Sequence, residues 1–365
     1  MSRNSAIQHM SATAYRIPTD GPESDGTIRW SSTTIVVVEI GAANAVGIGY
    51  TYADSSITSF IQTVLAPAVA RCDALATTGI YDTLVHTVRN VGRPGLAAAA
   101  ISAVDVAVWD LKARLLGVSL VALLGRARPR IAAYGSGGFT SYDDARLREQ
   151  LGRWVHEDGC GAVKMKVGRD PARDPDRVGT ARQAIGDDAE LFVDANGAYE
   201  RKQALAFAER VAPLGVTWFE EPVSSDDREG LRLLRDRAPA GMRIAVGEYG
   251  YDAFYFRHLL ESGACDVLQA DATRCGGVTG FLQAAALADA WNVPLSAHTA
   301  PSLHTSLCCA AGRAINVEYF YDHARIERML FDGARQVHDG QLEPDDSRPG
   351  LGLELKRRDA ARFAA

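Results

Sequence analysis

The stretch GAVKMKVGRDPARDPDRVGTARQAIG, residues 161–186, holds one unit of the pattern that decides the fold. Its first seven residues are apolar except for two lysines, and they predict a short buried β-strand. After a polar turn, DPDRVGTARQAIG predicts a helix that ends at Gly186. This order of strand and helix repeats from about residue 130 onwards. A series of eight such strands is typical of a TIM-like α/β barrel.

The predicted strands of this series are separated by helical segments that end at Gly, Asn or Pro. In order they are IAAY (131–134), GAVKMKV (161–167), ELFVDAN (190–196), VTWFEEP (216–222), RIAVGE (243–248), DVLQAD (266–271), PLSAH (294–298) and INVEYF (315–320).

The first third of the chain has a different pattern, which predicts an α+β domain. TTIVVVEI (33–40) and the run that follows it predict strands. Residues 95–117 predict an Ala-rich amphipathic helix. The segment RIPTDGPESDGTIRW (16–30) is polar and rich in Pro and Gly, so we expect a long mobile loop there.

These patterns divide the chain into three parts. We expect an N-terminal α+β domain at 1–125, the barrel at 126–321, and a C-terminal segment at 322–365 that rejoins the N-terminal domain. With 365 residues, 47% of them apolar, the chain is able to bury a large core.

Charge and cysteine content exclude several classes of protein. The net charge is −6, and no basic stripe is present to neutralise phosphates, so we expect no nucleic-acid partner. The six cysteines form no C-x-x-C pair, which indicates reduced thiols in a cytoplasmic protein. We see no secretion signal, and the longest apolar segments are strand-sized, so we expect no membrane span.

Polar side chains follow the predicted barrel strands at the place where an active site is expected. In such a barrel the site lies at the C-terminal ends of the strands. A structural rim would mix in Ser, Thr and Gly freely, whereas strands two to eight each place a titratable group there. The candidate residues are Lys164, Lys166, Asp194, Asn196, Glu220, Glu221, Glu248, Asp271, His298 and Glu318.

Three of these carboxylates, Asp194, Glu220 and Glu248, come from three adjacent strands. Neighbouring strands lie about 4.8 Å apart, so the three side chains can converge on one point. Carboxylates this close repel one another unless a cation lies between them. Because all the donors are oxygens, a hard ion such as Mg²⁺ is expected. Salt bridges to nearby Arg or Lys side chains are the alternative.

The remaining groups predict proton transfer. Lys164 and Lys166 share one face of their strand, and two adjacent ammonium groups lower each other's pKa, which suits a general base. Ion pairs with the acids of the next strands are the alternative. Asp271 and His298 lie on adjacent strands, so the carboxylate could fix the tautomer of the imidazole. The lysines and the histidine would then face each other across the barrel.

Together these motifs resemble those of the enolase superfamily, and specifically its mandelate racemase subgroup. The matching motifs are the K-x-K in VKMKVG, the D-x-N in VDANG, the E-E-P in WFEEPV, the glutamate in VGE, the aspartate in QADATRCGG, the histidine in SAHTAP and the glutamate in NVEYF. The resemblance covers essentially the whole chain. It implies a modified (β/α)7β barrel with an α+β capping domain.

The resemblance also implies roles for the site residues. Asp194, Glu220 and Glu248 would bind Mg²⁺. Lys166 would be one acid/base, tuned by Lys164, which would also contact the substrate carboxylate. His298, held by Asp271, would be the second acid/base.

Further roles follow for residues around these groups. Glu318 would hydrogen-bond the developing enolate, which requires it to be protonated or to share a proton. Glu221 would pair with a lysine behind the site. The substrate-binding candidates are Asn196, Arg29, Trp30 and Tyr52, of which Arg29 would hold a distal carboxylate.

The function that this set implies is removal of the α-proton of a carboxylate substrate through an enolate. We expect Mg²⁺-dependent dehydration of an acid sugar. The catalytic set fits a racemase or epimerase of a 2-hydroxy acid equally. From other classes, a metal-free Schiff-base aldolase or a non-catalytic binding barrel stays open. A small-molecule carboxylate and a second copy of the chain, in a homo-oligomer, are the expected partners.

Overall fold

The centre of the molecule, in a computed structural model that describes residues 5–365, is a closed barrel of eight parallel strands. Pairing of the last strand with the first, Glu318 opposite Tyr134, completes the circle. The strands are β4 (Ile131–Gly137), β5 (Ala162–Lys166), β6 (Glu190–Asp194), β7 (Val216–Glu220), β8 (Arg243–Val246), β9 (Val267–Ala270), β10 (Leu295–Ala297) and β11 (Ala314–Phe320).

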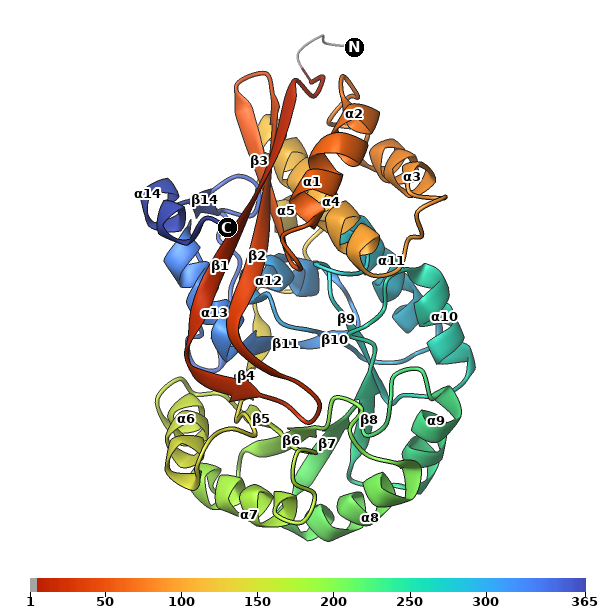
Figure 1. Ribbon diagram of the computed structural model, residues 1–365, viewed down its shortest axis with the longest axis vertical. Coiled ribbons are helices and arrows are strands. Elements are labelled where there is room, and N and C mark those ends of the chain that lie inside the picture. Colours follow the sequence, from red (N-terminus) through yellow and green to blue (C-terminus); the bar gives the residue numbers. More distant parts are fainter. Residues whose placement is uncertain (1–4) are drawn as a thin grey trace.

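Helices alternate with these strands and surround the barrel (Figure 1). They are α6 (Asp144–His156), α7 (Asp174–Ile185), α8 (Arg201–Val211), α9 (Arg228–Arg237), α10 (Ala253–Glu261), α11 (Gly277–Ala290) and α12 (Pro301–Ala310). The predicted (β/α)7β barrel is therefore confirmed. In residues 5–365 no helix is both long and apolar enough to cross a membrane.

An antiparallel sheet with helices packed on it forms a cap above the barrel (Figure 1). Its elements are β1 (His9–Ser24), β2 (Arg29–Ala42), β3 (Ala45–Tyr52), α1 (Ile57–Phe60), α2 (Ala66–Val69), α3 (Thr77–Thr87), α4 (Leu96–Leu116) and α5 (Leu120–Leu124). The apolar helix α4 lies directly on β3, because Gly49 has no side chain there. A Cβ atom at Gly49 would lie 2.1 Å from the carbonyl oxygen of Ala103.

The prediction of a mobile loop at residues 16–30 is wrong. This segment is the end of a β-hairpin in which β1 and β2 pair, and it reaches over the mouth of the barrel (Figure 1). The register shifts between Pro18 and Glu23, so the Pro- and Gly-containing residues lie in an irregular stretch. Because β1 is an edge strand, a proline and a bulge are tolerated there.

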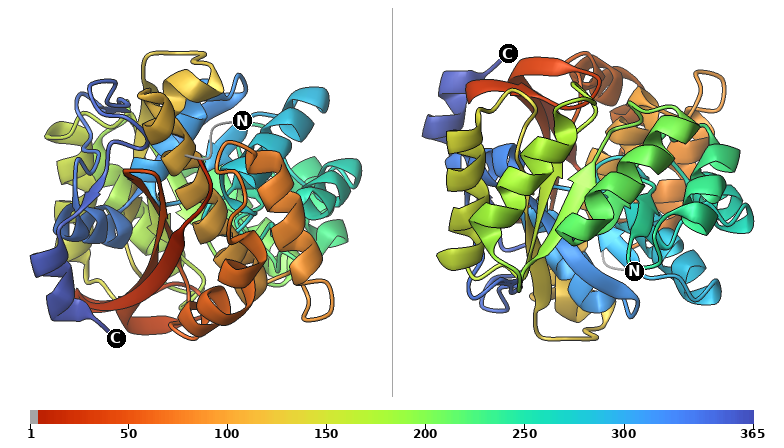
Figure 2. Two further views of the ribbon diagram at one scale, coloured as in Figure 1. Left: turned by 90° about the horizontal axis from the view of Figure 1, so that it is seen from above. Right: turned by 90° about the horizontal axis from the view of Figure 1, so that it is seen from below.

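The C-terminal segment contacts both the barrel and the cap. It contains α13 (Tyr321–Leu330), β12 (Phe331–Asp332), β13 (Gln341–Leu342), β14 (Glu354–Leu355) and α14 (Arg357–Ala360). β13 pairs antiparallel with β4, while the amide of Ala365 donates to the carbonyl of Ala14 at 3.0 Å. Figure 2 shows this segment beside the cap sheet. The boundaries 1–125, 126–321 and 322–365 stay a prediction.

An aromatic layer fills the barrel interior below the strand ends. Phe192 and Trp218 stack with ring centroids 4.8 Å apart, and Tyr134 lies against Phe192 at 5.3 Å. Both Trp218 and Tyr134 also contact the polar groups above them. The Trp218 indole donates to Glu220 Oε2 at 3.1 Å, and the ammonium of Lys164 lies 5.4 Å from the Tyr134 ring centroid. The layer therefore closes the site from below.

Candidate active site

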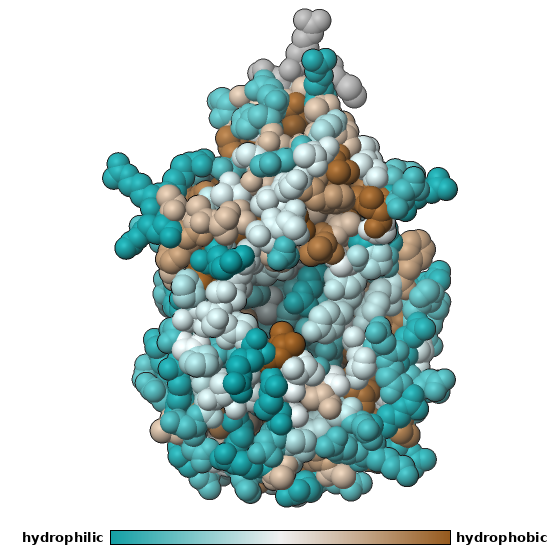
Figure 3. Space-filling view, viewed as in Figure 1, coloured by the Kyte–Doolittle hydropathy of each residue, from teal (hydrophilic) through white to brown (hydrophobic). Residues whose placement is uncertain are grey.

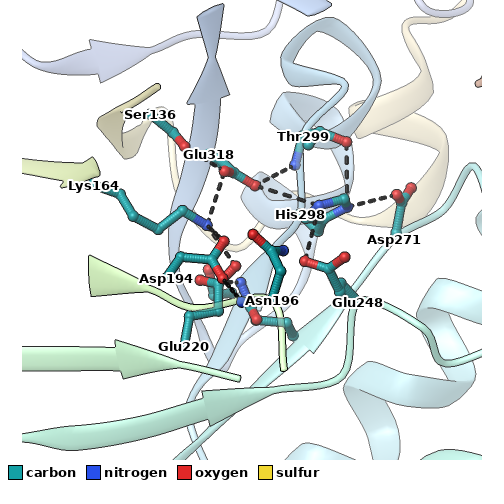
Figure 4. Close-up of polar contacts among 12 residues, drawn as sticks. Ser136, Lys164, Asp194, Asn196, Glu220, Glu248, Asp271, His298, Thr299 and Glu318 are labelled. Carbon is teal, nitrogen blue, oxygen red and sulfur yellow. Dashed lines mark hydrogen bonds and ion pairs between the residues drawn. The ribbon is translucent and has the colours of Figure 1, made fainter. Parts of the chain in front are cut away.

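The barrel strands bring the predicted polar residues together at their C-terminal ends (Figure 4). Asp194 and Glu220 are the last residues of β6 and β7, and Glu248 follows β8 by two residues. Asp271 and His298 each come directly after their strands, β9 and β10. Parallel strands of similar length end at one rim, so strand geometry alone carries these five side chains to one place.

The carboxylates of Asp194, Glu220 and Glu248 form a cluster that fits a divalent cation. One oxygen from each lies within 4.8 Å of the others, and all three side chains are buried. Burial and then the charge of Asp194 raise the pKa of Glu220 well above its usual value. Beside the cluster, Asn196 Oδ1 is buried and makes no hydrogen bond within residues 5–365. Crowded oxygen donors of this kind suit Mg²⁺.

The two lysines of β5 are bound to these same acids. Lys164 donates to Glu220 and lies 2.9 Å from Glu318 Oε1 and 3.5 Å from Asp194 Oδ2, while Lys166 donates to Asp194. Burial alone would lower the pKa of Lys166, but the charge of Asp194 outweighs it and the pKa is raised. The low pKa expected from two adjacent ammonium groups is therefore wrong for these side chains alone, because the acids are nearer than expected.

The dyad of Asp271 and His298 has the predicted geometry. His298 Nδ1 lies 2.8 Å from Asp271 Oδ2, and the amide of Thr273 donates to the other oxygen at 2.7 Å. Burial alone would raise the pKa of Asp271, but the hydrogen bond and charge of His298 hold it well below its usual range. With Nδ1 turned to the carboxylate, Nε2 faces Glu248 Oε2 at 3.3 Å.

Glu318 accepts hydrogen bonds on both oxygens, and the expectation that it is protonated or shares a proton when it contacts the enolate stays a prediction. Ser136 Oγ donates to one oxygen at 2.6 Å, and the amide of Thr299 donates to the other at 3.0 Å. Burial alone would raise the pKa of Glu318, but the charge of Lys164 outweighs it and the pKa is lowered. The charge of Lys164 therefore favours the ionised form of Glu318.

Glu221 has no lysine partner among the described residues, so the pairing expected for it is wrong. Its side chain is buried and Oε1 makes no hydrogen bond. Burial and then the charge of Glu248 raise the pKa of Glu221 well above its usual value. The residue lies one position beyond β7 with a left-handed φ of 38°, so the alternation of a strand no longer decides where its side chain points.

A cavity of about 420 Å³ connects the barrel mouth to the cap. The face in Figure 3 is hollowed near its middle, and residues of near-neutral to hydrophilic hydropathy surround most of the hollow. The barrel side of the cavity is lined by Lys166, Asn196, Glu248, Tyr249, Arg274, His298, Thr299, Glu318, Phe320 and His323. Lys166 and His298 therefore open into one space, as the sequence predicts.

Of the three substrate-binding candidates in the cap, the structure places two at the cavity. Trp30 and Tyr52 line it, whereas Arg29 is exposed and lies outside it, so its expected contact with a distal carboxylate is wrong. Successive residues of β2 point to opposite faces, and the side that takes Trp30 inward turns Arg29 outward. The Trp30 indole is fixed by donation to Glu23 Oε2 at 2.8 Å.

Sequence reasoning missed two basic residues of the cavity. Arg274 Nη1 lies 3.3 Å from Glu248 Oε1, and Nε lies 3.6 Å from Asp271 Oδ2. The missed signal is its position three residues after Asp271, inside a motif already recognised. His323 follows β11 by three residues. A search for polar residues in the first turn after each strand, and not only at the strand end, would have found it.

Comparison with known proteins identifies the family. Residues 146–360 match the family model described as enolase C-terminal domain-like. Residues 17–125 match the N-terminal domain of the mandelate racemase / muconate lactonizing enzyme family. The chain is 34% identical over 283 residues to the L-talarate/galactarate dehydratase of Salmonella typhimurium, covering 76% of this chain and 69% of the relative.

Solved structures agree over nearly the whole chain. A mandelate racemase/muconate lactonizing enzyme-like protein from Rubrobacter xylanophilus is 51% identical, with a TM-score of 0.96 over 99% of this chain and 100% of that one. A racemase from Streptomyces coelicolor A3(2) with bound magnesium is 30% identical, with a TM-score of 0.92 over 98% and 100% of the two chains. Named relatives include acid-sugar dehydratases, cycloisomerases and racemases. The chain is thus an enolase-superfamily enzyme and belongs to the mandelate racemase/muconate lactonizing enzyme family.

Proposed function

We propose that this enzyme is a Mg²⁺-dependent dehydratase of an acid sugar. The observation that carries the proposal is the placement of Lys166 and of the His298–Asp271 dyad around one carboxylate cluster, all opening into one cavity. Relatives that dehydrate acid sugars support the same reaction class.

In this proposal the substrate carboxylate lies against the cluster. Mg²⁺ held by Asp194, Glu220 and Glu248 would supply positive charge that stabilises the enolate oxygens. Lys164, fully buried beside Glu220, adds a second positive charge at the same place.

Lys166 takes the α-proton in this reaction, and it must be neutral to do so. Its ion pair with Asp194 holds it charged, whereas the neighbouring charge of Lys164 lowers its pKa. With Asp194 engaged as a metal ligand, its hold on the Lys166 proton would weaken, and burial and the charge of Lys164 both lower the pKa of Lys166. The fixed spacing of the two lysines on one strand face then matters for the base.

His298 acts as the general acid. Its Nδ1 is held by Asp271, so Nε2 is the nitrogen that gives a proton to the departing β-hydroxyl. The C–O bond breaks, water leaves, and the electron pair of the enolate forms a carbon–carbon double bond. The enol product then tautomerises to a keto acid.

Racemisation or epimerisation of a 2-hydroxy acid is the second candidate. The two proton-transfer groups reach the cavity from different strands, β5 and β10, which is the arrangement that reprotonation on the opposite face requires. The solved racemase from Streptomyces coelicolor supports it. A Schiff-base aldolase is less well supported, because Lys166 is already paired with Asp194.

The test compares two variants, Lys166→Ala and His298→Asn, with the exposed control Lys202→Ala. Acid–base groups contribute roughly 10²- to 10⁴-fold to rate, so we expect each site variant to lose at least about a hundredfold in kcat while the control keeps it. Activity is measured as dehydration of a panel of acid sugars and as α-proton exchange in D₂O.

The outcomes separate the candidates. Dehydration by the unmodified enzyme supports the proposal, while exchange with inversion and no loss of water supports the racemase. Turnover that survives in either site variant contradicts both. Borohydride trapping of substrate on Lys166 would instead establish the aldolase. The predicted homo-oligomer is tested by light scattering, where a mass of 39.2 kDa would contradict it.

A further inference from the structure

The imidazole of His323, in α13, is held rigidly in the wall of the cavity. Its ring stacks on the ring of Tyr52, with centroids 3.4 Å apart and planes at 11°. On another side the edge of Phe320 contacts it, at 5.1 Å and 88°. The cap and the barrel together therefore fix the plane of this ring.

His323 has no hydrogen-bond partner among residues 5–365. Its Nδ1 is buried and unpartnered, and no side chain or backbone group of the described chain bonds to Nε2. The Tyr52 hydroxyl behind it is also buried without a partner. Nε2 is not among the buried atoms, and His323 lines the cavity, so Nε2 is the nitrogen that a ligand in the cavity can reach and complete.

The charge state of His323 selects the chemistry of that ligand. Burial and then the charge of His298 hold the pKa of His323 well below its usual value, so the ring is neutral. A neutral imidazole offers one donor and one acceptor, which matches a hydroxyl group. A hydroxyl can donate to the ring or accept from it, whichever tautomer is present, whereas a carboxylate can only accept and finds no positive charge in the neutral ring.

The lining on the cap side of the cavity also favours a hydroxyl group over a carboxylate. Its lining carries hydroxyl groups, from Ser32, Thr33 and Thr34, and two carboxylates, Asp25 and Asp54, but neither Lys nor Arg. The cations on the barrel side lie at the catalytic groups and not at the cap, because Lys166 is the proposed base and Arg274 lies beside Asp271 as well as Glu248. A second carboxylate at the far end of a substrate would meet like charge with no cation to offset it.

We propose that His323 is a specificity residue that hydrogen-bonds a hydroxyl at the distal end of the substrate, and that the enzyme takes acid sugars with a single carboxylate. This rests on the proposed function in that the substrate carboxylate is assumed to lie at Asp194, Glu220 and Glu248. Aldonates are then substrates, and the aldarates of the same configuration are excluded.

The experiment measures binding separately from turnover. Calorimetry with Mg²⁺-loaded Lys166→Ala protein compares a panel of aldonates with their matched aldarates, for example D-gluconate with D-glucarate and D-galactonate with D-galactarate. We expect at least one aldonate to bind at least about tenfold more tightly than its aldarate. Adding His323→Phe, which keeps a stackable ring, should weaken that aldonate at least about tenfold, and His323→Asn should weaken it less.

Each of the other possible results counts against either the inference or the proposed function. Equal or tighter binding of the aldarate overturns the inference, as does full affinity in a folded His323→Phe protein. The comparison of aldonate with aldarate needs no change at position 323, so it holds even if that variant fails to fold. An aldonate preference without turnover in the unmodified enzyme contradicts the proposed function alone, and absence of any binding overturns both.

Discussion

Glu248 differs from the other two carboxylates of the cluster in its partners. Asp194 and Glu220 are each bonded to a lysine of β5. Glu248 instead lies 3.3 Å from both Arg274 Nη1 and His298 Nε2. Neutralising Glu248 therefore removes one negative charge from the candidate metal cluster while leaving both lysine pairs in place.

We expect Glu248→Gln to weaken Mg²⁺ binding at least about tenfold, because an amide oxygen carries no full negative charge for the cation. Calorimetric titration with Mg²⁺ alone measures this without any substrate. Glu209→Gln, an exposed change on α8, is the matched control. Equal Mg²⁺ affinity in the two variants would show that Glu248 is not a ligand.

The β1–β2 hairpin carries a buried acid at its contact with α13. Glu23 is fully buried, and its pKa is raised to about 8 by burial and then by the charge of Asp322, against the hydrogen bond from Trp30. In the unfolded chain the same group titrates near 4.5. The folded state therefore holds this proton until the pH approaches 8, and ionisation above that places two carboxylates side by side.

The pKa of Glu23 is higher in the folded state than in the unfolded chain. The proton on Glu23 therefore contributes its full stabilisation of the fold below about pH 4.5, and this stabilisation is lost as the pH rises through about 8. Glu23→Gln removes this dependence. We expect the variant to be more stable than the unmodified protein at pH 9, by up to about 5 kcal/mol, and similar at pH 4.5. Urea unfolding at pH 4.5, 7 and 9 measures the free energy of unfolding of both proteins. The same pH dependence of that free energy in the two proteins would refute the pKa shift.

How far the sequence predicts the site depends on the element that carries each residue. Asp194 and Lys166 were predictable because strand alternation and the strand-end rule place them directly. Glu221 was not, because its left-handed backbone lies beyond the strand. For the hairpin the sequence predicts a loop, since its Pro and Gly residues occupy an irregular strand edge that local composition does not distinguish from a loop. Contacts such as Tyr52 on His323 join segments that no local pattern relates.

Across the whole molecule, Asp110 joins three parts of the chain that are distant in sequence. Its buried carboxylate accepts from the amide of Ile48 in β3 at 2.8 Å and from the amide of Leu351 in the C-terminal segment at 2.6 Å. On its own helix it also accepts from Arg114 Nε at 2.7 Å. One side chain therefore connects the cap sheet, α4 and the C-terminal segment.

We expect Asp110→Ala to lower the free energy of unfolding by about 3 to 5 kcal/mol, because two buried amides and a guanidinium lose their acceptor. Asp236→Ala is the control, since its ion pair with Arg232 is exposed and should contribute less than about 1 kcal/mol. Guanidinium unfolding compares the two. Equal losses would mean that the Asp110 contacts do not hold the parts together.

The hydrogen bond between Ala365 and Ala14 has a consequence for biosynthesis. On a ribosome the β1 strand emerges early, but its neighbours near residue 364 follow only after the entire barrel has been translated. Until then the backbone groups of β1 at Ala14 and Tyr15 lack these partners, and an unpaired strand edge favours strand-to-strand association. Contacts between residues this far apart in the sequence form slowly, so the contact between the C-terminus and the cap sheet above the cavity is expected to form late in folding.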